Sequence, residues 1–323
     1  MRSLALRTAV LVALFAGLGY LAVRLVPGSG ERLRDAAPGW IAAGVAVELA
    51  ACAGFAWCFH ACFSYQPYVV RPARSAQVAL GELAAFALVP TGIAAPLLRF
   101  WALVRGGMPL RTVAVRSVVH GPLLSVPYIA VAAVLGIGVV VGTAPGDAPL
   151  AVALAPTGVT LVSGLIALAL TRIGRAKRLE GRGGWRGVLR ALVTIIPDGL
   201  REIPGRARAP GAIGGAAIWW ACDCAALWAA FQAVGASPNV GVIALGYMLG
   251  QLGTTLPLPG GVGGVEPIML GVLTASGVAA APGAAAIVVY RAISLGIQSS
   301  VGAVAVGILV PSVRAEARAG RPG

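Results

Sequence analysis

Charged residues are scarce in this chain of 323 residues, and acidic ones are the scarcest. Only 11% of the residues are charged, with 11 Asp and Glu against 25 Lys and Arg. Soluble domains carry about 25% charged residues, so this composition excludes an ordinary soluble protein. The apolar runs are about 20 residues long, as membrane-spanning helices require, and do not show the alternation of barrel strands. We therefore expect an all-α, polytopic membrane protein.

Cysteine and histidine are also few, with five and two residues. The cysteines lie in two apolar runs. The first run contains Cys52, Cys58 and Cys62, and the second contains Cys222 and Cys224. In such runs cysteine behaves as a small hydrophobic residue, which argues against a disulfide framework. Residues 58 and 62 would share one helix face while His60 points away, so no metal site is expected. No nucleophile and base stand together either, and we expect neither enzymatic activity nor a cofactor.

The net charge of +14 would favour nucleic-acid binding in a soluble protein. Here the basic residues fall mostly between apolar runs, where they report membrane topology, and no nucleic-acid partner is expected. The positive-inside rule places the connection with Arg71 and Arg74, the basic loop 171–210 and the tail 314–323 in the cytoplasm. We expect a multi-pass protein of the cytoplasmic membrane with both termini in the cytoplasm.

The segment QLGTTLPLPGGVGGVE, residues 251–266, interrupts an otherwise apolar helical pattern. Pro257 and Pro259 have no backbone N–H group to donate within a helix, and the glycines that follow them destabilise a helix. Apolar sequence flanks the segment, so unwound backbone is expected at membrane depth, where it must be buried in protein or line a wet cavity. Its N–H groups and the next helix N-terminus would suit an anion.

A similar interruption lies in the run from Ala76 to Gly106, at Pro90 and Pro96. If this run crossed the membrane once, Arg105 would lie outside the cell; if it enters and returns as a broken hairpin, Arg105 lies inside. We favour the hairpin. Residues 267–278, about 18 Å long as a helix, cannot span a core of about 30 Å and are expected to form a second hairpin with residues 240–256. The prediction is about six full crossings plus two broken re-entrant hairpins.

The two halves of the chain share this order of crossings and hairpin. Residues 1–148 form the first expected repeat, residues 149–313 the second, with the basic loop 171–210 inside it, and residues 314–323 a cytoplasmic tail. Three crossings separate equivalent elements, so the halves would have opposite orientations. That is the inverted-repeat plan of secondary transporters, with a site near the membrane midplane.

Ionisable residues within or beside the apolar runs cost about 2.5–3.5 kcal/mol each at a helix centre and must be paired or hydrated. One interpretation is that Glu48 and Asp223 pair with arginines to fix packing. The other is that these two and Glu82 exchange salt bridges or protons along a hydrated path. Glu266 would cap the helix after the interruption, or switch partner between Arg291 and Arg99.

Arginine grips phosphate with two parallel hydrogen bonds, and in a membrane cavity the natural phosphate belongs to a lipid headgroup. The predicted binding residues are Arg99, Arg116, Arg291, Gly260, Gly261, Gly263 and Glu266.

The segment LPLPGGVGGVE resembles the Pro-Gly-Gly-x-Gly-x-x-Glu signature of the lysylphosphatidylglycerol synthase transmembrane-region family. The matching residues are Pro259, Gly260, Gly261, Gly263 and Glu266. The pair Tyr290-Arg291 and the pair Leu98-Arg99 behind a proline are also similar to that family. One departure is Ala95-Pro96, where members often have glycine and an acid, and it weakens the assignment of Arg99.

The resemblance implies a membrane region that moves a modified lipid between leaflets. Multi-domain members join it to a soluble aminoacyl transferase, but this chain reaches Gly323 without a soluble segment of that size, which implies the translocase part alone. The implied cargo is an aminoacylated phosphatidylglycerol or a polyprenyl-phosphate-linked lipid.

The hypothesis is therefore a flippase-like translocase whose partners are anionic or phosphate-bearing membrane lipids. Two rival interpretations stay open: a proton-coupled transporter of a small solute, and a non-transporting membrane scaffold for a lipid-modifying enzyme. The sequence leaves the oligomeric state open and is compatible with an oligomer.

Overall fold

The computed structural model describes residues 24–89, 93–141, 209–256 and 258–318, together with positions 17, 20 and 158. Two of the six crossings that the sequence predicts, the apolar runs 4–26 and 149–170, lie almost wholly outside the described residues, as does the basic loop 171–210. Pro90 and Pro257 also lie outside them. Within the described ranges the regular elements are helices, apart from one isolated bridge between Tyr65 and Tyr68.

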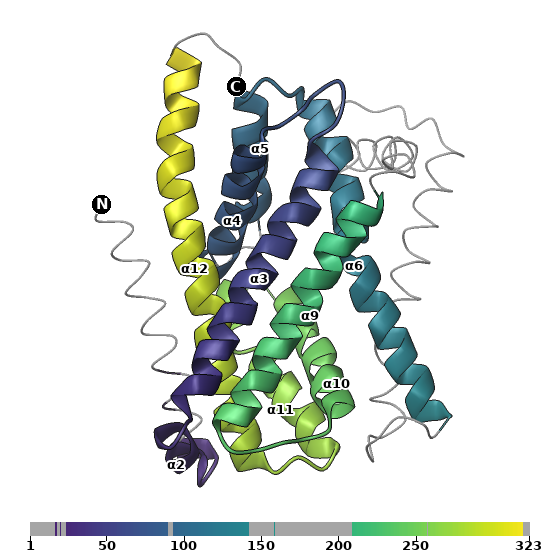
Figure 1. The fold of residues 1–323 in the computed structure, drawn as a ribbon, viewed down its shortest axis with the longest axis vertical. Helices are drawn as coiled ribbons and strands as arrows, with labels where there is room; N and C mark the ends of the chain where they lie inside the picture. Colours follow the sequence, from purple (N-terminus) through teal and green to yellow (C-terminus); the bar gives the residue numbers. More distant parts are fainter. Residues whose placement is uncertain are drawn as a thin grey trace.

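Four of the described helices are long and apolar enough to cross a membrane. They are α3 (Pro38–Phe63), α6 (Leu110–Val140), α9 (Ala209–Ala233) and α12 (Ala280–Arg318). Figure 1 shows α12 running the length of the molecule while α3 and α9 cross beside it. The chain is therefore a polytopic helical membrane protein, as its composition predicts.

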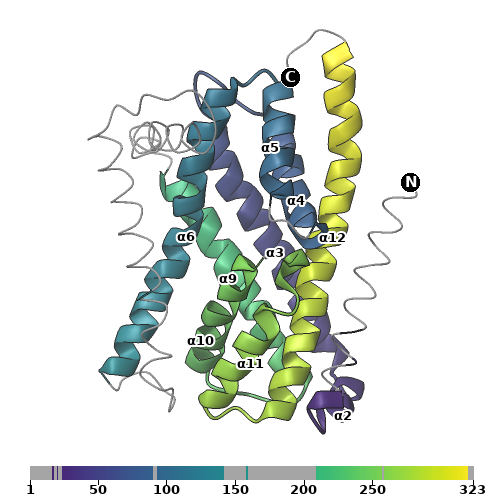
Figure 2. The same cartoon turned by 180° about the vertical axis from the view of Figure 1, so that it is seen from behind.

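The shorter helices form two pairs at opposite ends of the molecule (Figures 1 and 2). The first pair, α4 (Pro72–Leu88) and α5 (Ala94–Arg105), lies where α12 ends. The second pair, α10 (Val240–Gly250) and α11 (Val265–Ala275), lies where α12 begins, close to the short α2 (Ser29–Arg34). This is the arrangement that two broken hairpins entered from opposite sides would have; re-entry into a bilayer and the inverted repeat stay predictions.

The interruption between α10 and α11 begins before the end of the helix that the sequence predicts over residues 240–256. α10 ends at Gly250, and the chain continues through two 3₁₀ turns, η1 (Gln251–Thr255) and η2 (Pro259–Gly261). Gly253 in η1 packs against the backbone of Gly264, so this 3₁₀ turn lies directly on the start of α11. No side chain would fit between them.

Pro96 lies in the first turn of α5, so it marks the beginning of that helix and not the break itself. A first-turn N–H group has no partner within the helix, and a proline there costs little. The first interruption separates the end of α4 at Leu88 from the start of α5 at Ala94.

Glycines let the long helices approach closely. A Cβ atom on Gly215 of α9 would lie 2.5 Å from the backbone nitrogen of Cys58 in α3, and one on Gly54 would lie 2.8 Å from the carbonyl oxygen of Gly215. Small residues at such crossings favour helix packing in membranes. The crossing brings together α3 and α9, which carry the acidic residues Glu48 and Asp223.

Candidate functional site at the helix interruptions

The interruption between α10 and α11 is closed by a buried ion pair. Arg291 of α12 donates from Nε to Oε1 of Glu266 at 2.7 Å and from Nη2 to the carbonyl oxygen of Gly260 at 2.5 Å. The Glu266 side chain is 8% exposed and that of Arg291 only 3%. A charged pair buried this deeply needs further hydrogen bonds to offset the loss of water, and Gly260 supplies one.

Glu266 also accepts the backbone N–H of Gly263 through Oε2 at 2.6 Å. Its carboxylate reaches back across the first turn of α11, where a negative charge interacts favourably with the helix dipole. The N–H groups of Gly261 and Gly264 donate to the carbonyl oxygens of Leu258 and Gly261. The predicted anion-binding backbone is thus occupied by internal acceptors, and Glu266 fills the position of the anion.

The two interruptions lie against each other. Gly260 has a φ angle of +56°, which favours glycine, and a Cβ there would lie 2.9 Å from Leu295 and 3.6 Å from the Cα atom of Ala87. Ala87 stands one residue before the end of α4. The end of the first broken helix and the turn of the second are therefore in direct contact.

The first interruption carries its own ion pair. Arg99 of α5 donates from Nε and Nη2 to the two carboxylate oxygens of Glu82 in α4, both at 2.6 Å. The guanidinium group also lies over the rings of Phe63 and Phe59, with centroid distances of 5.3 and 5.8 Å. This double hydrogen bond ties the two short helices together, and it is the geometry with which arginine would hold a phosphate.

Glu48 of α3 and Asp223 of α9 are both buried and interact electrostatically. Asp223 accepts hydrogen bonds from Tyr247 at 2.6 Å and Tyr290 at 3.0 Å. Glu48 accepts one from Gln298 at 2.9 Å. The second carboxylate oxygen of Glu48 is buried and has no hydrogen-bond partner among the described residues, so Glu48 is less fully satisfied than Asp223.

The two clusters join on α12, because Tyr290 precedes Arg291 in the sequence. Arg291 interacts electrostatically with Asp223 and with Glu48, in addition to its contact with Glu266. One turn of one helix therefore contacts the carboxyl pair and the ion pair at the interruption.

Arg116 makes a different set of contacts from Arg99 and Arg291. Its guanidinium group donates to the carbonyl oxygens of Phe63, Tyr65 and Tyr68, with nitrogen–oxygen distances of 2.6, 2.9 and 3.0 Å. It also stacks on the Tyr65 ring at 3.6 Å from its centroid. Arg116 therefore binds carbonyl oxygens at the end of α3 and in the connection after it, and Phe63 contacts both Arg116 and Arg99.

Several polar residues of the site were missed by the sequence analysis: Tyr247, Gln251, Ser294 and Gln298. Tyr290, Ser294 and Gln298 recur every four residues and so occupy one face of α12. A polar stripe on an otherwise apolar helix is a detectable signal, and it points to Glu48 and Asp223.

A groove of about 790 Å³ runs along the first interruption between α4, α5 and α12. Its lining is mostly apolar, with Leu88, Val89 and Ala94 beside the interruption. Its other end carries Arg105 and Arg314, both exposed. Because these two arginines line one groove, α5 ends on the side of the molecule where α12 ends, as the hairpin interpretation predicts.

Among the described residues, no group of three or more His, Cys, Asp or Glu would hold a metal ion.

Residues 4–302 match a family model described as the lysylphosphatidylglycerol synthase TM region. No curated protein matches the chain significantly.

Proposed function

Because the chain belongs to the lysylphosphatidylglycerol synthase transmembrane-region family, we propose that it is a flippase-like translocase. Its cargo in this proposal is a phosphate-headgroup lipid, such as an aminoacylated phosphatidylglycerol or a polyprenyl-phosphate-linked lipid. The observation that carries the proposal is the set of contacts of Arg291. This arginine is buried at a helix interruption, and its hydrogen bonds within the described residues go to acceptors that a phosphate would replace, namely Glu266 and the Gly260 carbonyl.

The groove between α4, α5 and α12 supports a lipid over a fully polar ligand. Its volume lies within the usual range for ligand sites, roughly 300–1,000 Å³, and its apolar wall fits an acyl chain. Arg105 and Arg314 at its open end suit a phosphate in the headgroup layer. A lipid that enters there would have its chain beside the first interruption.

Transfer of the headgroup toward the centre requires an exchange of anions. Phosphate would displace Glu82 from Arg99 and Glu266 from Arg291, and each arginine would keep two hydrogen bonds throughout. The contact between Gly260 and the end of α4 places the two interruptions side by side, so the headgroup would pass between them without crossing bare hydrocarbon. The proposal assigns Arg99 and Arg291 to the phosphate and leaves Arg116 to the connection after α3.

Reconstitution into liposomes with a fluorescent phosphatidylglycerol tests this assignment. Arg99→Gln and Arg291→Gln should each slow translocation by roughly ten- to hundredfold, the value of a charge-assisted hydrogen bond. Arg34→Gln, at an exposed position of α2, is the matched control and should translocate like the unmodified protein. The double variant Glu266→Gln/Arg291→Gln leaves no unpaired charge, so it separates loss of function from loss of folding. Full activity in that double variant would refute the assignment.

The burial of two interacting carboxyl groups, Glu48 and Asp223, favours a second candidate, a proton-coupled transporter of a small solute. A buried carboxyl pair that holds one proton is a common element of proton relays in membranes. This alternative predicts solute uptake driven by a pH gradient, without lipid exchange, and its loss in Glu48→Gln. Lipid translocation that does not depend on a pH gradient would favour the first proposal.

A further inference from the structure

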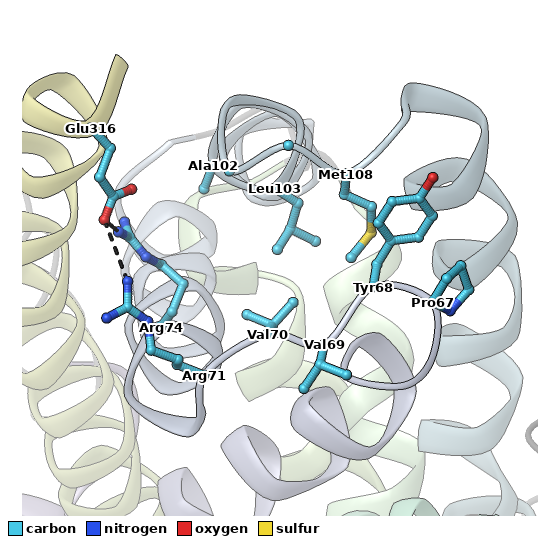
Figure 3. Close-up of a pocket in the computed structure, with 12 residues that line it drawn as sticks. Pro67, Tyr68, Val69, Val70, Arg71, Arg74, Ala102, Leu103, Met108 and Glu316 are labelled. Atoms are coloured by element: carbon cyan, nitrogen blue, oxygen red, sulfur yellow. Dashed lines mark hydrogen bonds and ion pairs between the residues drawn. The ribbon is translucent and has the colours of Figure 1, made fainter. Parts of the chain in front are cut away.

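A second cavity lies at the end of the molecule where α12 ends, apart from the helix interruptions (Figure 3). Its volume is about 350 Å³. The connection before α4, the last turn of α5 and the end of α12 enclose it. Figure 3 shows Arg71, Arg74 and Glu316 on one side and Val69, Leu103, Met108 and Tyr68 on the other. The cavity thus has a charged wall and a largely apolar wall.

The charged wall has an excess of one positive charge. Arg71 and Arg74 both contact Oε1 of Glu316, Arg71 at 3.8 Å and Arg74 much closer. Arg74 is also held by Ser312 of α12 at 3.1 Å. Both arginines flank the N-terminus of α4, where the helix dipole adds positive potential. Two guanidinium groups therefore share a single carboxylate oxygen.

The other carboxylate oxygen of Glu316 is poorly satisfied. Oε2 is buried and finds no hydrogen-bond partner within the part of the chain that the structure describes. Burying a charged acceptor without a donor is unfavourable, so the hydrogen-bonding capacity of the Glu316 carboxylate is only partly satisfied at this site. A group with three acceptor oxygens would satisfy both arginines and allow Glu316 to return to water.

We propose that this cavity binds a phosphate group and that Glu316 is its internal competitor. Arg71 and Arg74 hold the phosphate oxygens, and the apolar wall at Val69, Leu103 and Met108 covers the remainder of the ligand. The phosphate comes from a free phosphate compound or from a lipid headgroup at the membrane surface. Binding displaces Glu316 and releases the end of α12, the helix that carries Arg291. The site is distinct from the translocation site and does not depend on lipid transport.

Titration calorimetry on the full chain in an uncharged detergent tests the proposal. Inorganic phosphate at constant ionic strength and short-chain phosphatidylglycerol are the two probes. Arg74→Gln should weaken binding by roughly tenfold or more, because a charge-assisted hydrogen bond is lost. Arg71→Gln, at an exposed position, should weaken it in the same direction without affecting folding. Glu316→Gln should tighten binding several-fold, because the internal competitor loses its charge.

The control is Arg318→Gln, an exposed arginine on the same helix that does not line the cavity, and its affinity should not change. A response with inorganic phosphate supports a soluble source, and a response only with phosphatidylglycerol supports a headgroup. Failure of both probes to bind would overturn the proposal. Equal affinities across Arg71→Gln, Arg74→Gln and Glu316→Gln, or weaker binding in Glu316→Gln, would overturn it as well.

Discussion

Arg291 and Glu266 form a buried ion pair that spans two helices and closes the interruption between α10 and α11. Glu266 follows the glycine segment, and Arg291 lies on α12, 25 residues further along the chain. Each partner has a second contact to the unwound backbone, at Gly263 and Gly260. The pair therefore stabilises the interruption and, in the proposed function, occupies the place of the cargo's phosphate.

The first prediction is a strong coupling between these two residues. Glu266→Gln and Arg291→Gln each leave one buried charge without its partner, and each should destabilise the protein by about 3–5 kcal/mol. The double variant leaves no charge and should lose less than the sum. Denaturant unfolding in detergent measures the cycle. Additive losses would contradict the pairing. The control is Arg71→Gln, at an exposed ion pair, which should cost about 1 kcal/mol or less.

Arg99→Lys should impair translocation more than it impairs folding. Lysine keeps the charge near Glu82 but cannot make the two parallel hydrogen bonds of a guanidinium group. We expect a loss of stability of about 1–2 kcal/mol, about that of one hydrogen bond, and a much larger loss of translocation because the phosphate loses the same geometry. Liposome assays and unfolding curves on the same preparation compare the two effects. Equal translocation by Arg99→Lys and the unmodified protein would remove the guanidinium geometry from the mechanism.

The crossing of α3 and α9 depends on one glycine, and its neighbour provides the control. Gly215→Ala would place a methyl group against the backbone of Cys58 and should destabilise the protein by about 1–3 kcal/mol. Gly214→Ala meets no atom within 4 Å and should be neutral or slightly stabilising. Thermal unfolding of the two variants measures the difference. Identical unfolding midpoints for the two variants would mean that α3 and α9 can move apart to accommodate the methyl group at residue 215.

The sequence predicts the described helices well because their signals are local. Long apolar runs define α3, α6, α9 and α12, and prolines and glycines define the interruptions. The end of α10 at Gly250 was missed, because it depends on the packing of Gly253 against Gly264, which lies beyond the interruption. Pro96 was misplaced for a related reason: a proline is compatible both with a break and with a first helical turn.

The candidate site was predicted in part. The two interpretations of Glu266 were a helix cap and a switch of partner between Arg291 and Arg99; the structure shows its contacts with Gly263 and Arg291, and the switch stays a prediction. Pairing of Glu82 with Arg99 was not specified, because hydrophobic periodicity does not determine which buried charges meet. Arg116 was predicted to bind phosphate together with Arg99 and Arg291, and its three carbonyl acceptors depend on a connection whose path the sequence does not specify.

Cysteine labelling tests whether the short helix pairs enter the membrane and return. In a background without the five native cysteines, Ala73→Cys in the first turn of α4 and Leu110→Cys at the start of α6 should react with a membrane-impermeant reagent from one side. Ser237→Cys and Ala279→Cys, which flank α10 and α11, should react from the other side. All four positions are exposed. Labelling of Ala73→Cys and Leu110→Cys from opposite sides would show that α4 and α5 together cross the membrane.

The last prediction separates backbone strain from packing at the second interruption. Gly260 and Gly277 both have positive φ angles, +56° and +85°, so alanine at either position should cost about 1–2 kcal/mol in backbone strain. At Gly277 the added methyl group meets open space, whereas at Gly260 it would lie 2.9 Å from Leu295. Gly260→Ala would also displace the carbonyl oxygen that Arg291 binds. We expect both variants to fold, with a lower unfolding midpoint for Gly260→Ala and a loss of translocation only in that variant. If the two variants translocate equally well, the carbonyl of Gly260 does not position Arg291 for its cargo.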